Sequence, residues 1–256
     1  ILLGVARELA AASHRPNDVL FVFQPAEEGG AGGKIMVDEG CLRGEVLGRK
    51  ADMMFGLHGW TSVPVGRVES RIGALMAATD EFIVEFHGQG GHAAIPQFAK
   101  DPIVAISAFV SAIQTMVSRN TDPFDQMVVT VGHLWGGTTN NVIPELASAH
   151  GTIRTMTDEN RAMAKERLQE IAHGIASAYG LKACVQLNEG YPVVRNAPEA
   201  VERFVRIASQ ALGAEFVSDQ ADPCMGGEDF AYYGSECPSC FYFLGLLPDG
   251  QDSMPP

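Results

Sequence analysis

The stretch VLFVFQPAEE, residues 19–28, places two adjacent carboxylates directly after a short apolar run. Residues 19–23 are aliphatic or aromatic and are stopped by Pro25, a pattern that predicts a buried strand. A second apolar run, 51–57, ends at His58 and predicts another strand. A helical pattern precedes the first run and a shorter one separates the two runs. This alternation indicates an α/β domain with a parallel sheet.

The middle of the chain has a different pattern, which begins at residue 80. Strands and helices are predicted there in the order strand, helix, strand, strand, helix, strand, over residues 82–86, 102–118, 127–131, 147–156, 159–178 and 182–187. This βαββαβ order is that of the ferredoxin-like split unit, an antiparallel sheet with two helices on one face.

A predicted helix at 198–212 and a predicted strand at 241–244 then resume the first pattern. We therefore expect an α/β domain in two parts, 1–74 and 192–256. The ferredoxin-like α+β domain, 75–191, is expected to be inserted between them.

Composition excludes several classes of protein. Of the 256 residues, 46% are hydrophobic and 19% are charged, which is typical of an ordered globular protein. The formal net charge of -13 argues against nucleic acid as a partner, because such binders need clustered Lys and Arg. The longest apolar stretch, 103–113, is far shorter than the roughly 20 residues that cross a bilayer. Five cysteines, an odd number, favour the reduced thiols of a cytoplasmic protein over a disulfide framework.

The two adjacent carboxylates, Glu27 and Glu28, need a reason if they follow a buried strand. They repel each other, and burial raises their pKa values unless a cation is present. Beside a divalent metal, one can act as a ligand while the other takes a proton from water. A solvated acidic turn would explain the pair equally well. His58, at the end of the other predicted strand, adds an imidazole and favours a zinc or manganese site.

Six motifs occur in order along the chain: FQPAEEGG at 23–30, FGLHGW at 55–60, GQGGHAAIP at 88–96, NVIP at 141–144, GTIRT at 151–155 and MGGEDFAYY at 225–233. Together they resemble the metallopeptidase-like amidohydrolases, the family of hippurate hydrolases, N-acyl-amino-acid amidohydrolases, auxin-conjugate hydrolases and aminobenzoyl-glutamate hydrolases. The resemblance implies a zinc-peptidase-like catalytic domain whose inserted domain serves as a lid and forms a homodimer. It also implies two divalent metal ions, and hydrolysis of an N-acyl amino acid to a carboxylic acid and a free amino acid.

The resemblance implies roles for residues of the catalytic domain and the lid. Glu27 would be the general base, and Glu28 and His58 would be metal ligands, in agreement with the chemical argument above. His92, reaching over from the opposite protomer, would stabilise the oxyanion.

Further residues are implied to bind the substrate. Asn141 and Arg154 would hold the carboxylate of the amino-acid half, and Glu228 with Asp229 would line or buttress the pocket. The family's other metal ligands, a Cys and a His before residue 1 and a His beyond residue 256, lie outside these residues. We therefore expect the 256-residue chain by itself to bind metal weakly and to be inactive. Two alternatives stay open: a non-catalytic binding or dimerisation protein that has lost metal ligands, and a metallo-aminopeptidase or dipeptidase.

Overall fold

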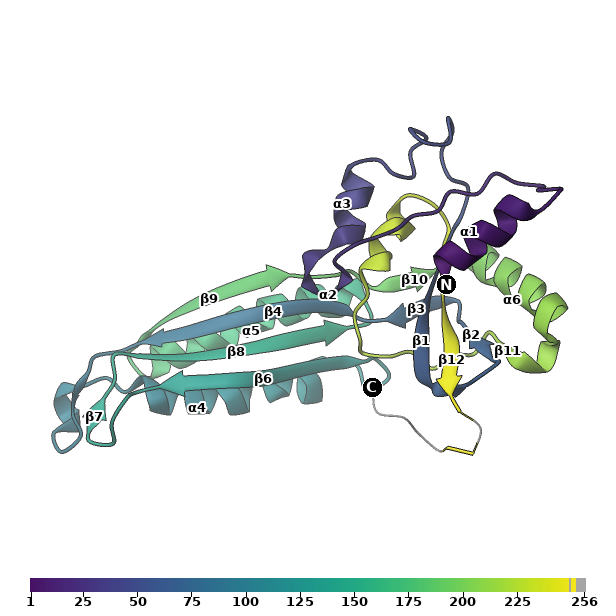
Figure 1. Cartoon of the computed structure of the whole chain (residues 1–256). Coiled ribbons are helices and arrows are strands. Elements are labelled where there is room, and N and C mark those ends of the chain that lie inside the picture. Colours follow the sequence, from purple (N-terminus) through teal and green to yellow (C-terminus); the bar gives the residue numbers. More distant parts are fainter. Residues whose placement is uncertain (249, 252–256) are drawn as a thin grey trace. The chain divides into compact units, whose positions relative to one another are not determined.

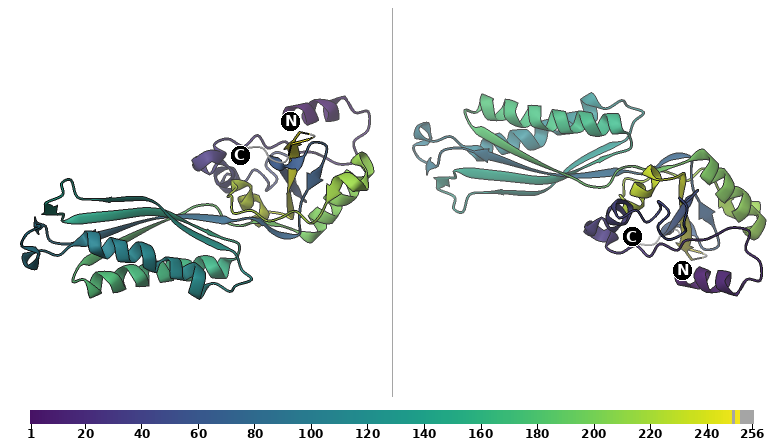
Figure 2. Two further views of the ribbon diagram at one scale, coloured as in Figure 1. Left: turned by 90° about the horizontal axis from the view of Figure 1, so that it is seen from below. Right: turned by 90° about the horizontal axis from the view of Figure 1, so that it is seen from above.

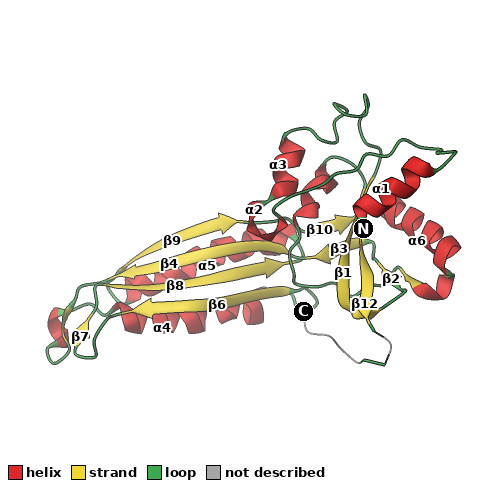
Figure 3. Cartoon of the chain, in the orientation of Figure 1, coloured by secondary structure: helices red, strands yellow, loops and turns green. Residues whose placement is uncertain are grey.

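The computed structural model describes residues 1–248 and 250–251, and the chain divides into two compact units (Figure 1). Unit 1 comprises Ile1–Leu75, Val194–Pro223 and Glu228–Pro256. Unit 2 comprises Met76–Val193 and the short segment Cys224–Gly227. Figure 3 distinguishes the helices and strands of both.

Unit 1 mixes helices and strands, as the predicted α/β class requires. Its strands are β1 (Met54–Pro64), β2 (Val68–Glu69), β3 (Gly73–Met76, whose last residue opens unit 2), β10 (Val194–Asn196), β11 (Val217–Ser218) and β12 (Ser239–Leu247). Its helices are α1 (Leu2–Ala11), α2 (Glu27–Gly30), α3 (Gly32–Asp38) and α6 (Pro198–Leu212), with 3-10 turns η3 (Ala214–Phe216) and η4 (Asp229–Ser235).

The main sheet of unit 1 is mixed, so the expectation of a parallel sheet was wrong in part. Its strand order is β1-β12-β2-β11. The long pair β1 and β12 is parallel, with Met54 opposite Ser239 and Trp60 opposite Gly245. The short strand β2 runs antiparallel to β12. The reason is local: the chain turns back after β1 through Gly66, which has a φ of 86°, so that β2 reverses direction.

Residues 19–23 do not form the strand predicted for them. The turn with the two carboxylates, Glu27 and Glu28, does follow this segment. Residues 19–23 lack the hydrogen-bonded ladder of a strand, and Val19 and Phe23 are 47% and 60% exposed. A cavity of about 920 Å³ is lined both by this segment and by Met54–Leu57 of β1. A strand exists only where its backbone groups pair with those of a neighbouring strand, so the apolar composition of residues 19–23 is not enough to make them a strand.

The sheet of unit 1 is packed on one side by α6. Ala200, Val201 and Phe204 of this helix are buried against Val68 and Cys240. The phenyl ring of Phe204 stacks on Tyr242, with ring centroids 4.5 Å apart. Helix α6 thus anchors β12, the strand that holds β1 in place.

Unit 2 confirms the predicted βαββαβ order. Its main elements are β4 (Ala78–His87), α4 (Pro102–Ala112), β6 (Met127–Gly136), β8 (Leu146–Thr155), α5 (Asp158–Ala178) and β9 (Lys182–Glu189). Smaller ones are β5 (Gly91–His92), η1 (Pro96–Phe98), the π-helical turn η2 (Met116–Asn120) and β7 (Val142–Ile143). The sheet order is β6-β8-β4-β9 with antiparallel neighbours, and both helices cover one face (Figure 2).

The core of unit 2 lies between this sheet and its two helices. Phe82, Phe86 and Phe109 are buried there, at most 1% exposed. The carboxylate of Asp80, 2% exposed, accepts two hydrogen bonds of 2.7 Å from the guanidinium of Arg161 on α5. Such a paired, buried charge fixes the register of a helix on a sheet.

One helical segment of unit 2, Pro102–Asn120, is long and apolar enough to cross a membrane by length and composition alone. Ala105, Ile106, Phe109 and Met116 on it are at most 1% exposed and pack into the core of unit 2. Its apolar character is therefore accounted for by the packing of a globular domain.

Candidate functional site

The two adjacent carboxylates lie on a tight turn whose backbone is strained at both ends. Helix α2 (Glu27–Gly30) is one turn long and is bounded by Ala26 (φ 55°, ψ 41°) and Ala31 (φ 48°, ψ 45°), both left-handed. An L-residue pays roughly 1–2 kcal/mol in this conformation, because its Cβ crowds the following carbonyl. The turn therefore needs support from the surrounding structure.

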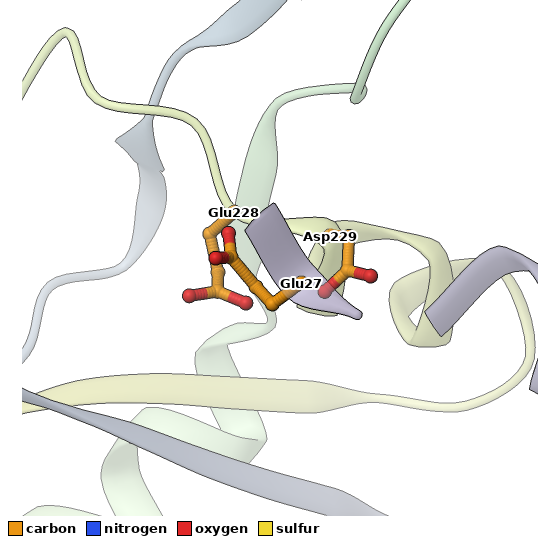
Figure 4. Close-up of side chains that lie close together, drawn as sticks. All are labelled: Glu27, Glu228 and Asp229. Carbon is orange, nitrogen blue, oxygen red and sulfur yellow. The ribbon is translucent and has the colours of Figure 1, made fainter. Parts of the chain in front are cut away.

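Three carboxylates converge at this turn (Figure 4). Oxygens of Glu27, Glu228 and Asp229 lie within 4.8 Å of one another. Glu27 comes from α2, whereas Glu228 and Asp229 stand at the start of η4, about 200 residues later in the chain. The FQPAEEGG motif and the part of the MGGEDFAYY motif from Glu228 onward are thus brought together in unit 1.

Burial and mutual repulsion favour protonation of this cluster. Burial raises the pKa of Glu228 to about 7; a hydrogen bond of 3.3 Å from the backbone N–H of Phe230 opposes the rise, and the charges of Glu27 and Asp229 add to it. The pKa of Glu27 is also raised, first by burial and then by the charge of Asp229, while His58 lowers it. A nearby cation would reverse these shifts and keep the carboxylates ionised.

Asp229 is held by hydrogen bonds from the segment that carries the turn. It is fully buried, and each of its oxygens accepts a hydrogen bond. Oδ2 accepts from the backbone N–H of Gly33 at 2.8 Å, and Oδ1 accepts from Nε2 of Gln24. The motif at 225–233 drew attention to this acid, but the partners that define its place are about 200 residues away in the chain.

The predicted metal ligands Glu28 and His58 are both exposed. His58 lies inside β1, opposite Phe243 of β12, and not at the end of the strand as expected, because the pairing with β12 continues to Trp60. Its Nδ1 lies 2.7 Å from the carbonyl oxygen of Gly59. Within residues 1–248 and 250–251, neither residue belongs to a cluster of three or more candidate ligands, so their role as ligands stays a prediction.

The donors present in unit 1 suit a divalent cation. Three carboxylates gather there, and His58 lies near enough to lower the pKa of Glu27. Carboxylates and imidazoles are ligands that zinc and manganese sites use. The raised pKa values give the physical reason, since crowded carboxylates gain most from a positive charge. The residues therefore fit a metal ion.

His92 and Asn141 lie side by side in unit 2. Strand β5, which contains His92, pairs with β7, and the backbone N–H of Ala93 donates to the carbonyl of Asn141 at 3.0 Å. Nδ1 of His92 accepts from the backbone N–H of Ala94 at 3.1 Å. A neutral His92 must then carry its proton on Nε2, which leaves this exposed ring able to donate a hydrogen bond.

Arg154 lies on β8 of the four-stranded sheet, at the end of that strand away from the β5–β7 pair. It pairs in register with Thr79 at the start of β4, whereas Leu146, next to the β5–β7 pair, is opposite His87 at the end of β4. The eight residue steps from Leu146 to Arg154 along β8 amount to about 26 Å at the usual rise of a strand. Within one chain, Arg154 and Asn141 are therefore too far apart to hold the same carboxylate.

Comparison with known proteins decides the family. The profile of peptidase family M20/M25/M40 matches residues 1–255. The chain belongs to this family. The resemblance to metallopeptidase-like amidohydrolases is thereby confirmed, and the mixed α/β fold of this M20 family chain agrees with its structural neighbours.

Relatives within the M20 family give more detail. An N-acetyldiaminopimelate deacetylase of Streptococcus sanguinis is 41% identical over 247 residues, which are 96% of this chain and 64% of that protein. A protein of methicillin-resistant Staphylococcus aureus superposes with a TM-score of 0.81 at 33% identity, over 91% of this chain and 58% of its own. A dinuclear metal-binding M20 peptidase of Bacillus subtilis gives 0.71 at 30% identity, over 87% and 54%. The chain thus spans less than two thirds of the length of these relatives.

Proposed function

We propose that the full-length gene product is a metal-dependent amidohydrolase that cleaves N-acyl amino acids. The observation that carries this proposal is the strained Glu27–Gly30 turn, which presents the Glu27 carboxylate beside Glu228 and Asp229 in a chain of the M20 family. The deacetylases among its relatives act, by their name, on an acetylated amino acid.

Glu28 and His58 would hold the metal, with further ligands from outside residues 1–256. Two divalent ions, zinc or manganese, are proposed because the relative from Bacillus subtilis is described as dinuclear. Bound there, the metal supplies Lewis-acid polarisation of the amide carbonyl and of water.

Glu27 performs the proton transfers in this proposal. It takes a proton from the attacking water, and after the tetrahedral species forms it returns that proton to the leaving nitrogen. Glu27 lies beside Glu228 and Asp229, and in the ionised form that a nearby cation favours it can accept this proton. His92, donating from Nε2, would stabilise the oxyanion.

The substrate carboxylate would be held by Arg154 and Asn141, and the distance between them requires two chains. If both contact one carboxylate, Asn141 and its neighbour His92 come from the second copy in a homodimer. The edge strand β6 suits such an assembly, since Leu134 and Trp135 on it are 52% and 47% exposed. The dimerisation and lid roles of unit 2 are part of the proposal.

The acyl group remains a choice between acetyl and aromatic acyl groups. Deacetylase relatives favour acetyl, whereas the motifs resemble those of hippurate hydrolases as well. The proposed compartment is the cytoplasm, in keeping with five cysteines that are all free thiols.

A substrate panel tests the proposal. The full-length gene product, loaded with Zn²⁺ or Mn²⁺, is offered N-acetyldiaminopimelate, hippurate and a dipeptide with a free amino terminus. We expect release of a carboxylic acid and a free amine from at least one of the two N-acyl substrates, and loss of this activity on chelation. Cleavage of the dipeptide alone would identify a peptidase, and metal-loaded protein that cleaves none of the three would favour a binding protein.

A further inference from the structure

The Glu27–Gly30 turn keeps an unfavourable backbone conformation. Over the residues that the structure describes, Ala26 and Ala31 are the only non-glycine residues with positive φ, and they stand at the two ends of this turn. Strained conformations persist where the surrounding structure holds them, and they concentrate at active sites.

Both flanks of the turn are tied to a single buried carboxylate. Gln24, two residues before Ala26, donates from Nε2 to Oδ1 of Asp229, and Gly33, two residues after Ala31, donates its backbone N–H to Oδ2 at 2.8 Å. Asp229 is 0% exposed, so its side chain is shielded from water; the bond from Gly33 is buried and the bond from Gln24 is partly buried. One side chain therefore closes a bridge across the turn.

The backbone around this bridge is packed without spare room. A Cβ at Gly33 would lie 2.6 Å from the carbonyl oxygen of Asp229 and 2.9 Å from Oε1 of Gln24. A Cβ at Gly32 would lie 1.8 Å from the carbonyl oxygen of Pro25. Contact of this kind on both sides restricts the turn to one conformation.

We propose that Asp229 is a positioning residue that holds the strained Glu27–Gly30 turn, and with it both of its carboxylates, in the working geometry. The alternative, that Asp229 itself ligates metal or transfers protons, is less consistent with its contacts, because each oxygen already faces an N–H donor. This inference rests on the proposed function only in taking Glu27 as the general base and Glu28 as a metal ligand. The bridge itself can be tested without activity.

Hydrogen exchange on the 256-residue chain gives the direct test. Asp229→Ala removes both bonds. Asp229→Asn can keep both, with its oxygen accepting from Gly33 and its NH₂ donating to Gln24 once that amide turns over. We expect the amides of Gly30 and Gly33 to exchange about tenfold faster or more in Asp229→Ala, and within about twofold of wild type in Asp229→Asn. The matched control, Asp38→Ala, removes an exposed ion pair on α3 and should leave both amides unchanged.

Relief of the strain provides an independent arm of the test. Glycine adopts the left-handed conformation freely, so Ala31→Gly in the Asp229→Ala background should slow the exchange of Gly30 again, by about threefold or more. If Asp229→Ala does not fold, Gln24→Ala removes one of the two bonds and should give an intermediate acceleration. Wild-type exchange in Asp229→Ala, or in Gln24→Ala where only that variant folds, would overturn the proposal.

Kinetics of the full-length gene product separate positioning from chemistry. Asp229→Ala should lower kcat about tenfold or more and weaken metal binding, because Glu28 is held by the same turn, while Asp229→Asn keeps most of kcat and most of the metal. An Asp229→Asn enzyme with wild-type exchange but the kcat of Asp229→Ala would show a direct chemical role and contradict positioning. If wild-type protein hydrolyses no amide, the proposed function fails, and the exchange experiment still decides the bridge.

Discussion

At the scale of the residue, Glu228 couples stability to pH. It is 7% exposed, and burial raises its pKa from 4.5 to about 7. Between these values the native state binds more protons than the unfolded state, so stability falls as pH rises. We expect the unfolding free energy of the chelator-treated chain to drop by up to about 3 kcal/mol between pH 4.5 and pH 8. Urea unfolding at several pH values measures this drop.

Glu228→Gln should flatten that profile, because the amide is neutral at every pH. An exposed acid, Glu39→Gln, serves as the control and should leave the slope unchanged. A profile of the same slope in Glu228→Gln and in wild type would assign the pH dependence to other groups.

Gly33 should tolerate no side chain, since a Cβ there would meet the backbone of Asp229 at 2.6 Å. We expect Gly33→Ala to lower the unfolding free energy by roughly 1–3 kcal/mol, as overpacking does. The matched control is Gly4→Ala in helix α1, where nothing lies within 4 Å of the new Cβ. It should be neutral or slightly stabilising. Equal stability of the two variants would contradict the close packing of the turn.

The roles of some single residues could be predicted from the sequence, and the role of Asp229 could not. Glu27, Glu28 and His58 follow from pattern, because adjacent carboxylates and an imidazole after apolar runs indicate a metal site. The bridging role of Asp229 could not be found in this way. It depends on two hydrogen bonds to residues 205 and 196 positions away, and no local signal encodes them.

Among the secondary-structure elements, helices with a periodic apolar pattern could be predicted from the sequence, whereas strands whose bounds depend on a pairing partner could not. Helix α6 agrees with the predicted 198–212, because its apolar residues recur at helical spacing over fifteen residues. The segment 19–23 carries an apolar run of strand type but pairs with no strand among the described residues. Strand β1 runs past its predicted end because β12 continues to pair with it. Pairing is a tertiary property, and composition does not determine it.

The β5–β7 pair leads to a prediction about subunit exchange. If His92 serves the neighbouring active site, mixing full-length His92→Ala protomers with Glu27→Gln protomers should restore activity, although each is inactive alone. After random exchange, half of the dimers are mixed and each has one competent pocket, so about a quarter of wild-type activity is expected. Confirmed exchange without recovery would place His92 in its own chain's site or outside catalysis.

At the scale of the whole molecule, the proposed chemistry divides between the two units. Unit 1 carries the carboxylate turn and His58, and unit 2 carries His92, Asn141 and Arg154. Because the chain spans 64% of a relative's length, the remaining metal ligands are expected outside residues 1–256. We accordingly expect the 256-residue chain to bind Zn²⁺ or Mn²⁺ weakly in a calorimetric titration. Tight, stoichiometric binding by this chain would show that its own residues complete the site.

In the proposed mechanism Glu27 moves the proton, while Glu28 and His58 hold the metal. This assignment is tested most directly by measuring amide hydrolysis and bound metal together in full-length Glu27→Gln, beside wild type and His58→Ala. We expect Glu27→Gln to keep its metal but to lose about 10²- to 10⁴-fold in turnover, the usual contribution of a general base. His58→Ala should lose metal and activity together. Near-normal turnover in Glu27→Gln would contradict the role of Glu27 as general base.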